Sequence, residues 1–224
     1  MLRLTYEISG IFVALLMGLY AFRYLTSLYK FFFFQLVAYI LTYMLSYVVL
    51  AVPSINPYPG SNQWLFNLDM PIETGLLVWP VYMYYESTRE RFLILLGYLV
   101  FFGILLSEIM VQGLRVFANY GAVAESILLL ILYLVLAYSQ FRRENNPWKS
   151  SPLIWVSVGI LIYFVGTVPY LSLMHFLNLH YRMLSYYLYN VITVGLSNIR
   201  YIMLAIGFWF IRHNALLKST GINE

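Results

Sequence analysis

NVITVGLSNIRYIMLAIGFWFIR, residues 190–212, is the last long apolar run of the chain and the stretch that best indicates its fold. At helical spacing its polar residues fall within about 80° of one another and form one stripe; they are Asn190, Thr193, Ser197 and Arg200. An arginine at the centre of a spanning helix costs roughly 3 kcal/mol to insert. The stretch therefore predicts a membrane helix whose stripe faces protein or water and whose Arg200 has an acidic partner.

The composition of the whole chain favours the same class of protein. Its 224 residues are 62% hydrophobic and 10% charged, with a mean hydropathy of +0.77, whereas soluble domains carry about a quarter of their residues as charged. Runs of roughly twenty apolar residues recur along the chain and leave no room for a separate soluble domain. We expect a single transmembrane domain, residues 1–224, in a lipid bilayer. The net charge of +4 reflects basic loops and does not indicate a nucleic-acid partner.

Seven spanning helices are predicted, at about 7–25, 30–53, 65–85, 91–112, 118–140, 152–174 and 188–211, so the fold class is an all-α polytopic bundle. Residues 175–187 are read as a connector between the last two helices. Most basic residues fall on one side of such a bundle: Arg23, Lys30, Arg89, Arg91, Arg142, Arg143, Lys149, Arg212 and Lys218, against Arg3, Arg115 and Arg182 on the other. Because basic loops stay in the cytoplasm, this distribution predicts an amino terminus outside and a carboxyl terminus inside, a receptor-like topology.

Two absences bear on the cellular location. The sequence has no cysteine and no Asn-x-Ser/Thr sequon, and its first apolar run has few basic residues before it and no small-residue cleavage site. We read that run as a retained helix, and we expect a multi-pass protein of a bacterial inner membrane.

Two glutamates lie in other apolar runs and are candidate partners of Arg200. Glu73 and Glu125 each sit seven or eight residues into a helix that enters from outside, roughly 10–12 Å below the outer boundary. Two glutamates with one arginine are costly to ionise together, so one of them is a candidate proton site. The predicted ligand-binding residues are Glu73, Glu125, Asn190, Ser197, Asn198 and Arg200. The alternative is a buried ion pair that fixes the register of the helices without any ligand.

Motifs of known enzyme classes do not occur in the sequence. There is no nucleophile elbow, zinc-protease motif, Walker loop or dinucleotide fingerprint. The histidines are too few and badly spaced for a metal site, and the last helix has no lysine for a retinal Schiff base; they are His175, His180 and His213. We predict no catalytic residue, metal or cofactor.

Two short stretches carry a resemblance to a known group. At Asn62, Trp64, Asn67 and Pro71-Ile72-Glu73, and again from Asn198 to Tyr201, the chain resembles largely uncharacterised seven-helix integral membrane proteins of the Bacteroidota. The resemblance implies a small stand-alone membrane protein with no assigned activity, and it brings no site residue with it.

Three functions are consistent with these patterns. The first is a receptor-like or signalling accessory protein whose outward-facing polar cavity binds a small polar ligand or a proton, together with a signalling partner or in a homo-oligomer. The second is a proton-coupled transporter of small molecules that uses the same residues. The third is a lipid-modifying membrane enzyme, for which Asp69 and Glu73 on adjacent turns are the one indication.

Overall fold

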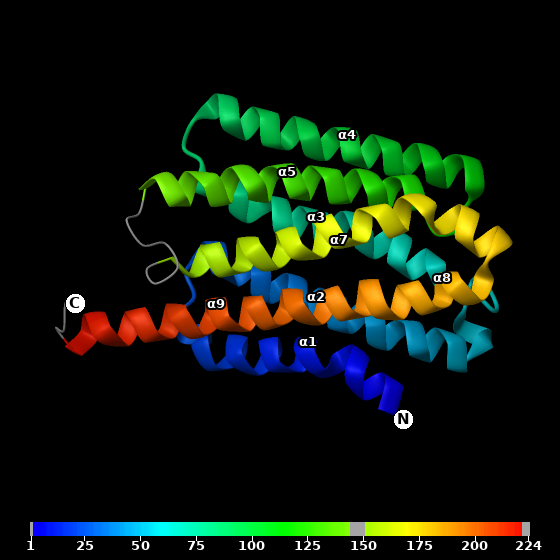
Figure 1. Cartoon of the computed structure of the whole chain (residues 1–224), viewed down its shortest axis with the longest axis horizontal. Helices are drawn as coiled ribbons and strands as arrows, with labels where there is room; N and C mark the ends of the chain where they lie inside the picture. Colours follow the sequence, from blue (N-terminus) through cyan, green and yellow to red (C-terminus); the bar gives the residue numbers. More distant parts are fainter. Residues whose placement is uncertain (1, 144–150, 221–224) are drawn as a thin grey trace.

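The computed structural model describes residues 2–143 and 151–220, and this part of the chain is helical, with short connections and no strand. The helices lie side by side along the long axis, and the two ends of the chain lie at opposite ends of the bundle (Figure 1). The elements are α1 (Leu2–Ala21), η1 (Phe22–Tyr24), α2 (Ser27–Ala51), η2 (Pro53–Ile55), α3 (Gln63–Tyr84), α4 (Thr88–Gln112), α5 (Asn119–Arg143), α7 (Pro152–His180), α8 (Arg182–Leu188), the π-helical segment η3 (Tyr189–Val194) and α9 (Gly195–Thr220).

Several of these helices suit a membrane. Five are long and apolar enough to cross one by length and composition: Ser27–Ala51, Thr88–Gln112, Asn119–Arg143, Pro152–Met174 and Arg182–Leu217. A helical, multi-pass membrane protein is therefore supported. The remaining two predicted ranges, 7–25 and 65–85, are also helical, but the apolar sequence of α3 contains the polar residues Asn67, Asp69 and Glu73. A count of seven spans stays a prediction.

The predicted connector at residues 175–187 is wrong. Helix α7 continues to His180, and α8 begins at Arg182, so only Tyr181 separates them, with φ −140° and ψ 54°. The reason lies in the local sequence, which has leucine, methionine and aromatic residues there but no glycine or proline to end a helix. The predicted bounds of 152–174 and 188–211 are consequently too short.

Six helices form a ring. Each packs on the next in the order α1, α9, α7, α5, α3 and α2, and α2 closes the ring on α1, while α4 lies outside against α5 and α3. Small residues allow the close approaches that this packing needs. A Cβ at Gly159 of α7 would lie 2.7 Å from Met203 Cβ and 3.0 Å from Arg200 O of α9, so only a glycine fits there.

One half of the ring is filled by apolar side chains. The fully buried residues of its core include Phe32 and Leu36 of α2, Leu77 of α3, Tyr133 of α5 and Phe208 of α9. All of them lie toward the end where α1 finishes and α2 begins. The other half of the ring, toward the α2–α3 connection and Tyr181, encloses the cavity described below.

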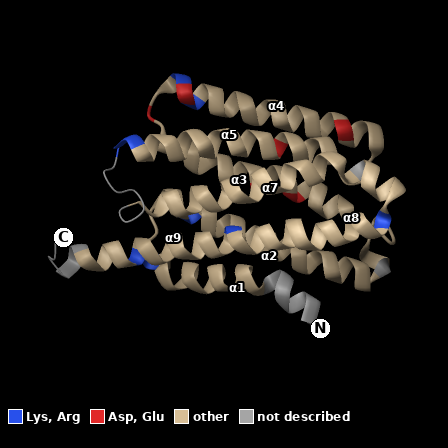
Figure 2. Cartoon of the chain, viewed as in Figure 1, with Lys and Arg blue, Asp and Glu red and all other residues tan. Residues whose placement is uncertain are grey.

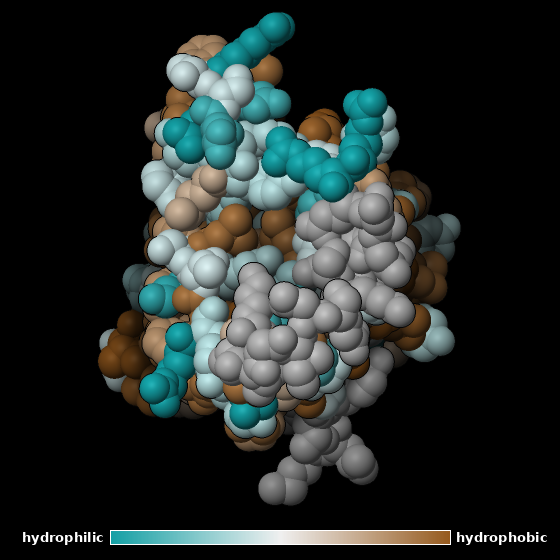
Figure 3. Space-filling view, turned by 90° about the vertical axis from the view of Figure 1, so that its left-hand side faces the viewer, coloured by the Kyte–Doolittle hydropathy of each residue, from teal (hydrophilic) through white to brown (hydrophobic). Residues whose placement is uncertain are grey.

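The charged residues are unevenly placed along the bundle. Arginines gather at the filled end, at the start of α4, the end of α5 and the last turns of α9, with Arg115 and Arg182 at the other (Figure 2). Figure 3 looks onto the filled end and shows hydrophilic residues clustered over it. Lys149, which belongs to the predicted basic set, lies outside the described residues.

Candidate functional site

An ion pair between α9 and α3 separates the apolar core from the cavity. Arg200 Nη2 lies 2.7 Å from Glu73 Oε1, and Gln35 Nε2 of α2 donates to the same oxygen at 3.0 Å. Glu73 is thus the acidic partner of Arg200. The pair and Gln35 together join three helices at the level where the packed core ends.

Aromatic rings surround the guanidinium of Arg200, which is buried. Its central carbon lies 5.1 Å from the ring centroid of Tyr163, 5.8 Å from Phe164 and 5.4 Å from Tyr201. Ring faces attract a cation at such distances and replace part of the water that a buried arginine has lost. The pair therefore has the surroundings that a desolvated charge requires.

Two further carboxyl groups near this level, those of Asp69 and Glu125, have hydroxyl groups as their hydrogen-bond partners among the described residues. Thr74 Oγ1 lies 2.6 Å from Glu125 Oε1, and Thr42 Oγ1 donates to Asp69 Oδ1 at 2.8 Å. Both acidic residues are buried, with 8% of Glu125 and 6% of Asp69 exposed. Neither is bound to Arg200, so the expected meeting of Arg200 with both glutamates is realised only for Glu73.

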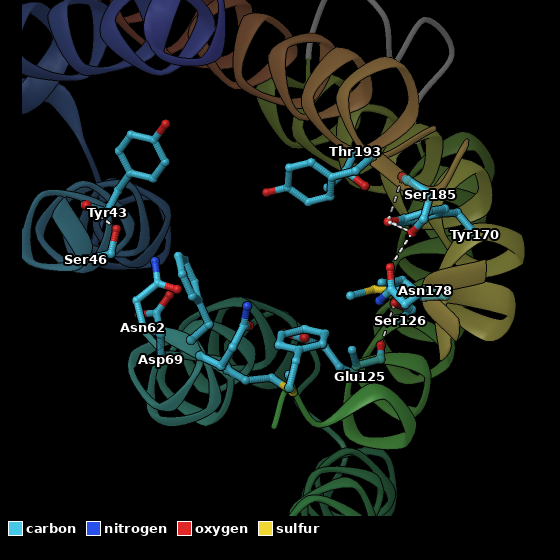
Figure 4. Close-up of a pocket in the computed structure, with 18 of the residues that line it drawn as sticks. Tyr43, Ser46, Asn62, Asp69, Glu125, Ser126, Tyr170, Asn178, Ser185 and Thr193 are labelled. Atoms are coloured by element: carbon cyan, nitrogen blue, oxygen red, sulfur yellow. Dashed lines mark hydrogen bonds between the residues drawn. The ribbon is translucent and has the colours of Figure 1, made fainter. Parts of the chain in front are cut away.

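The cavity has a volume of about 790 Å³ and lies inside the ring of helices (Figure 4). Its wall is built from α2, α3, α5, α7, α8 and η3. It runs from Asn62, Gln63 and the exposed Arg182 at one end of the bundle to Glu73 and Phe164 at its floor. The lining is largely aromatic and apolar, with carboxyl, amide and hydroxyl groups set among these side chains, so a predominantly polar cavity is not what the structure has.

Three of the lining tyrosines form a ladder on α2, called here the α2 tyrosine ladder: Tyr39, Tyr43 and Tyr47. The rings of Tyr39 and Tyr43 stack at 6.2 Å, those of Tyr43 and Tyr47 meet edge to face at 5.1 Å, and the last two hydroxyls lie 3.0 Å apart. Spacing of four residues puts them on one helix face. Thr42, which binds Asp69, is the immediate neighbour of Tyr43 in the chain.

The predicted site residues are only partly brought together. Glu73 and Glu125 line the cavity, whereas Asn190, Ser197, Asn198 and Arg200 do not. Asn190 Nδ2 donates to Tyr186 O at 2.8 Å, and Ser197 is half-buried. The π-helical segment explains the difference, because its wider turn shifts the residues before it relative to those after it and breaks the stripe expected for a regular α-helix.

Asn198 has a packing role. Its Oδ1 accepts the backbone N–H of Gly10 at 2.8 Å, and its Nδ2 donates to Val194 O at 3.1 Å. It therefore joins α9 to α1 on the side of α9 that faces away from the cavity wall.

Sequence reasoning missed two features of the site. Asp69 was named only together with Glu73 as an indication of an enzyme and was not predicted as a ligand-binding residue, but it lines the cavity. The α2 tyrosine ladder was missed as well, although its spacing of four residues was visible in the sequence. The pairing of Asp69 and Glu73 that would suit an enzyme is not present, since Glu73 is held by Arg200 and Gln35 and Asp69 by Thr42.

Comparisons with protein-family models, curated proteins and solved structures find no match to this chain.

Proposed function

We propose that this chain is a receptor-like, multi-pass membrane protein that binds a small molecule in the cavity between α2, α3, α5, α7 and α8. One observation carries the proposal: the cavity holds about 790 Å³, and two buried carboxyl groups, Asp69 and Glu125, line it, each with a hydroxyl group as its partner among residues 2–143 and 151–220. Small-molecule sites have volumes of about 300–1,000 Å³, mostly apolar walls and a few polar groups that orient the ligand. Burying polar groups at this depth costs free energy unless they bind a ligand, a water molecule or a proton.

The distribution of arginines supports a cavity that is reached from outside the cell. They gather at the filled end of the bundle, and the cavity occupies the opposite half. If the basic end is cytoplasmic, as the positive-inside rule predicts, the mouth at Asn62 and Arg182 faces outward. The amino terminus would then be outside and the carboxyl terminus inside, with α1 and α3 completing seven spans.

A ligand bound in the cavity would contact helices that the ion pair at the cavity floor also joins to their neighbours. The α2 tyrosine ladder and Asp69 form one wall, and Thr193 of η3 belongs to the opposite side (Figure 4). The ion pair of Arg200 with Glu73 joins α9 to α3 directly beneath. Binding that draws the walls together would favour one arrangement of α3 against α9, which is how a ligand shifts a receptor between two states.

The contacts of Thr74 support a proton site at Glu125. Thr74 Oγ1 lies 2.7 Å from Met70 O and 2.6 Å from Glu125 Oε1, but a threonine hydroxyl has only one hydrogen. When that hydrogen goes to Met70 O, the contact with Glu125 needs a hydrogen from the carboxyl group. The proton-binding function expected for the glutamates thus belongs to Glu125 more than to Glu73, which is paired with Arg200.

The binding function is tested with four soluble probes of similar shape. They are phenylethyltrimethylammonium, phenylalanine, phenylpropionate and 2-phenylethanol, which are a cation, a zwitterion, an anion and a neutral compound. We expect at least one to raise the melting temperature of the protein purified in maltoside micelles, in proportion to its concentration. A wild-type protein that responds to none of the four would overturn the proposal.

A matched pair of variants locates the binding. Thr193→Phe fills the cavity, and because Thr193 Oγ1 has no hydrogen-bond partner its loss breaks no bond. Val191→Phe introduces the same ring two residues away on an exposed position, 53% accessible. We expect the first variant to lose the response to the probe and the second to keep it.

A transporter is the second candidate, favoured by the π-helical segment in the cavity wall. Such segments are frequent at functional sites. Uptake of the bound probe into proteoliposomes separates the two functions. Flux that is lost in Glu125→Gln supports a carrier, whereas binding without flux supports the receptor.

A further inference from the structure

We infer that the ligand of this cavity is an organic cation: an ammonium group attached to an apolar or aromatic body. This inference rests on the proposed binding function and names the chemistry that the cavity selects.

The carboxyl groups around the cavity differ in whether a basic group compensates them. Glu73 is neutralised by Arg200 at 2.7 Å. Asp69 Oδ1 and Glu125 Oε1 each have one hydroxyl partner, and neither residue has a basic partner within the described part of the chain. Since the contacts of Thr74 favour a proton on Glu125, Asp69 is the carboxyl group of the cavity that lacks a counter-charge, and a cationic ligand would supply it.

The positions of the basic residues exclude an anionic group as the ligand's main point of attachment. Arg182 is the basic residue that the described lining contains, and it is exposed at the mouth. Arg200 lies beneath the floor, outside the lining, and its charge is matched by Glu73. A ligand carboxylate deep in the cavity would meet Asp69 or Glu125 and no free base.

The aromatic wall of the cavity suits an ammonium group. The α2 tyrosine ladder adjoins Asp69 through Thr42, whose hydroxyl donates to Asp69 Oδ1 at 2.8 Å. Tyrosine faces attract ammonium groups, and the combination of ring faces with a carboxylate is the usual way in which proteins hold alkylated amines. Figure 4 shows Tyr43 and Asp69 on the same side of the cavity, with Glu125 across from them.

The volume of the cavity indicates how large the ligand is. An ammonium group alone would fill a small part of about 790 Å³. The rest of the lining includes Phe66, Met70, Phe117 and Leu171, which suit an apolar or aromatic body. A bare metal ion or a small inorganic cation does not match this wall.

The four probes decide the class of ligand. We expect the dissociation constant of phenylethyltrimethylammonium, measured by calorimetry in maltoside micelles, to be about tenfold lower than those of the other three. Tighter binding of phenylalanine, phenylpropionate or 2-phenylethanol would overturn the inference and leave the proposed binding function standing. Binding of none of the probes, or binding that Thr193→Phe leaves unchanged, would refute the proposed function itself.

Variants identify the groups that recognise the charge. Asp69→Asn keeps the size of the side chain and should weaken binding of the cation about tenfold while changing binding of 2-phenylethanol little. Glu90→Gln removes one negative charge from an exposed position at the far end of the bundle and serves as the control. Unchanged affinity in Asp69→Asn would contradict the inference.

A second variant keeps the test decisive if Asp69→Asn does not fold. Tyr43→Leu removes one ring of the ladder and should reduce the preference for the cation over 2-phenylethanol several-fold. An unaltered preference would contradict the role of the ladder. Dihexanoyl phosphatidylcholine then distinguishes the source of the ammonium: Asp69-dependent binding of this lipid assigns a headgroup, and binding of the free cation alone assigns a soluble amine.

Discussion

At the scale of single residues, the arginine in the last helix determines the chemistry around it. Arg200 is buried, makes its hydrogen bond to Glu73 and is surrounded by three aromatic rings. Breaking a buried ion pair by removing one partner is far more damaging than replacing both, because the remaining charge loses its compensation. The pair is therefore a structural element of the cavity floor, and the proposed ligand would be recognised by other groups.

This leads to a prediction about the ion pair. Glu73→Gln should lower the free energy of unfolding by about 3–5 kcal/mol, whereas the double variant Glu73→Gln with Arg200→Met should recover most of the loss. Titration of the purified protein with a denaturing detergent measures both. Equal losses in the single and double variants would show that the pair carries no buried charge penalty.

At the scale of the elements, Gly10 marks a close approach of α1 to α9. A Cβ at Gly10 would lie 2.6 Å from Asn198 Oδ1 and 2.9 Å from Asn198 Cα, the latter a backbone atom that cannot turn away. The same asparagine accepts the backbone N–H of Gly10, so a small displacement of α1 also breaks this bond.

Alanine substitutions at two glycines test this contact. Gly10→Ala should destabilise the protein by about 1–3 kcal/mol, the usual range for an overpacked site. Gly103→Ala on α4 is the matched control, since a Cβ there meets nothing within 4 Å, and it should be neutral or stabilising by up to about 1 kcal/mol. Melting temperatures compare the two, and a larger loss at Gly103 would refute the packing argument.

At the scale of the whole molecule, the filled and hollow halves of the ring lie at opposite ends. The apolar core around Tyr133 and Phe208 lies on the side of the arginine cluster, and the cavity lies on the other. A bundle organised in this way can be reached by a ligand from one side of a membrane while the other side stays closed. The orientation therefore decides from which compartment the proposed ligand would arrive.

The absence of cysteine from the sequence makes the orientation measurable. Single cysteines at Ser61→Cys and Arg89→Cys mark the two ends of the bundle without any background thiol. A membrane-impermeant maleimide should label the first in intact cells and the second only after permeabilisation. The reverse pattern would turn the cavity toward the cytoplasm.

The sequence by itself determined the class of protein and the places of its helices. Long apolar runs and the scarcity of charge are local properties, so helices at all seven predicted ranges could be foreseen. That Arg200 needed an acidic partner also followed from the sequence, because the cost of an unpaired charge in an apolar environment does not depend on the fold. The boundary at Tyr181 was less accessible, since only the backbone at this residue interrupts two otherwise continuous helices.

Only the tertiary structure decided which residues meet. Glu73 and not Glu125 pairs with Arg200, Asn198 serves the contact with α1, and Asp69 reaches the cavity. Each outcome depends on which helices are neighbours in the ring and on the π-helical segment that shifts the face of the last helix. Helical spacing describes one isolated helix, whereas a cavity is defined by several helices together. For this reason the residues of the cavity could be read in the sequence, but the sequence did not show that they share a site.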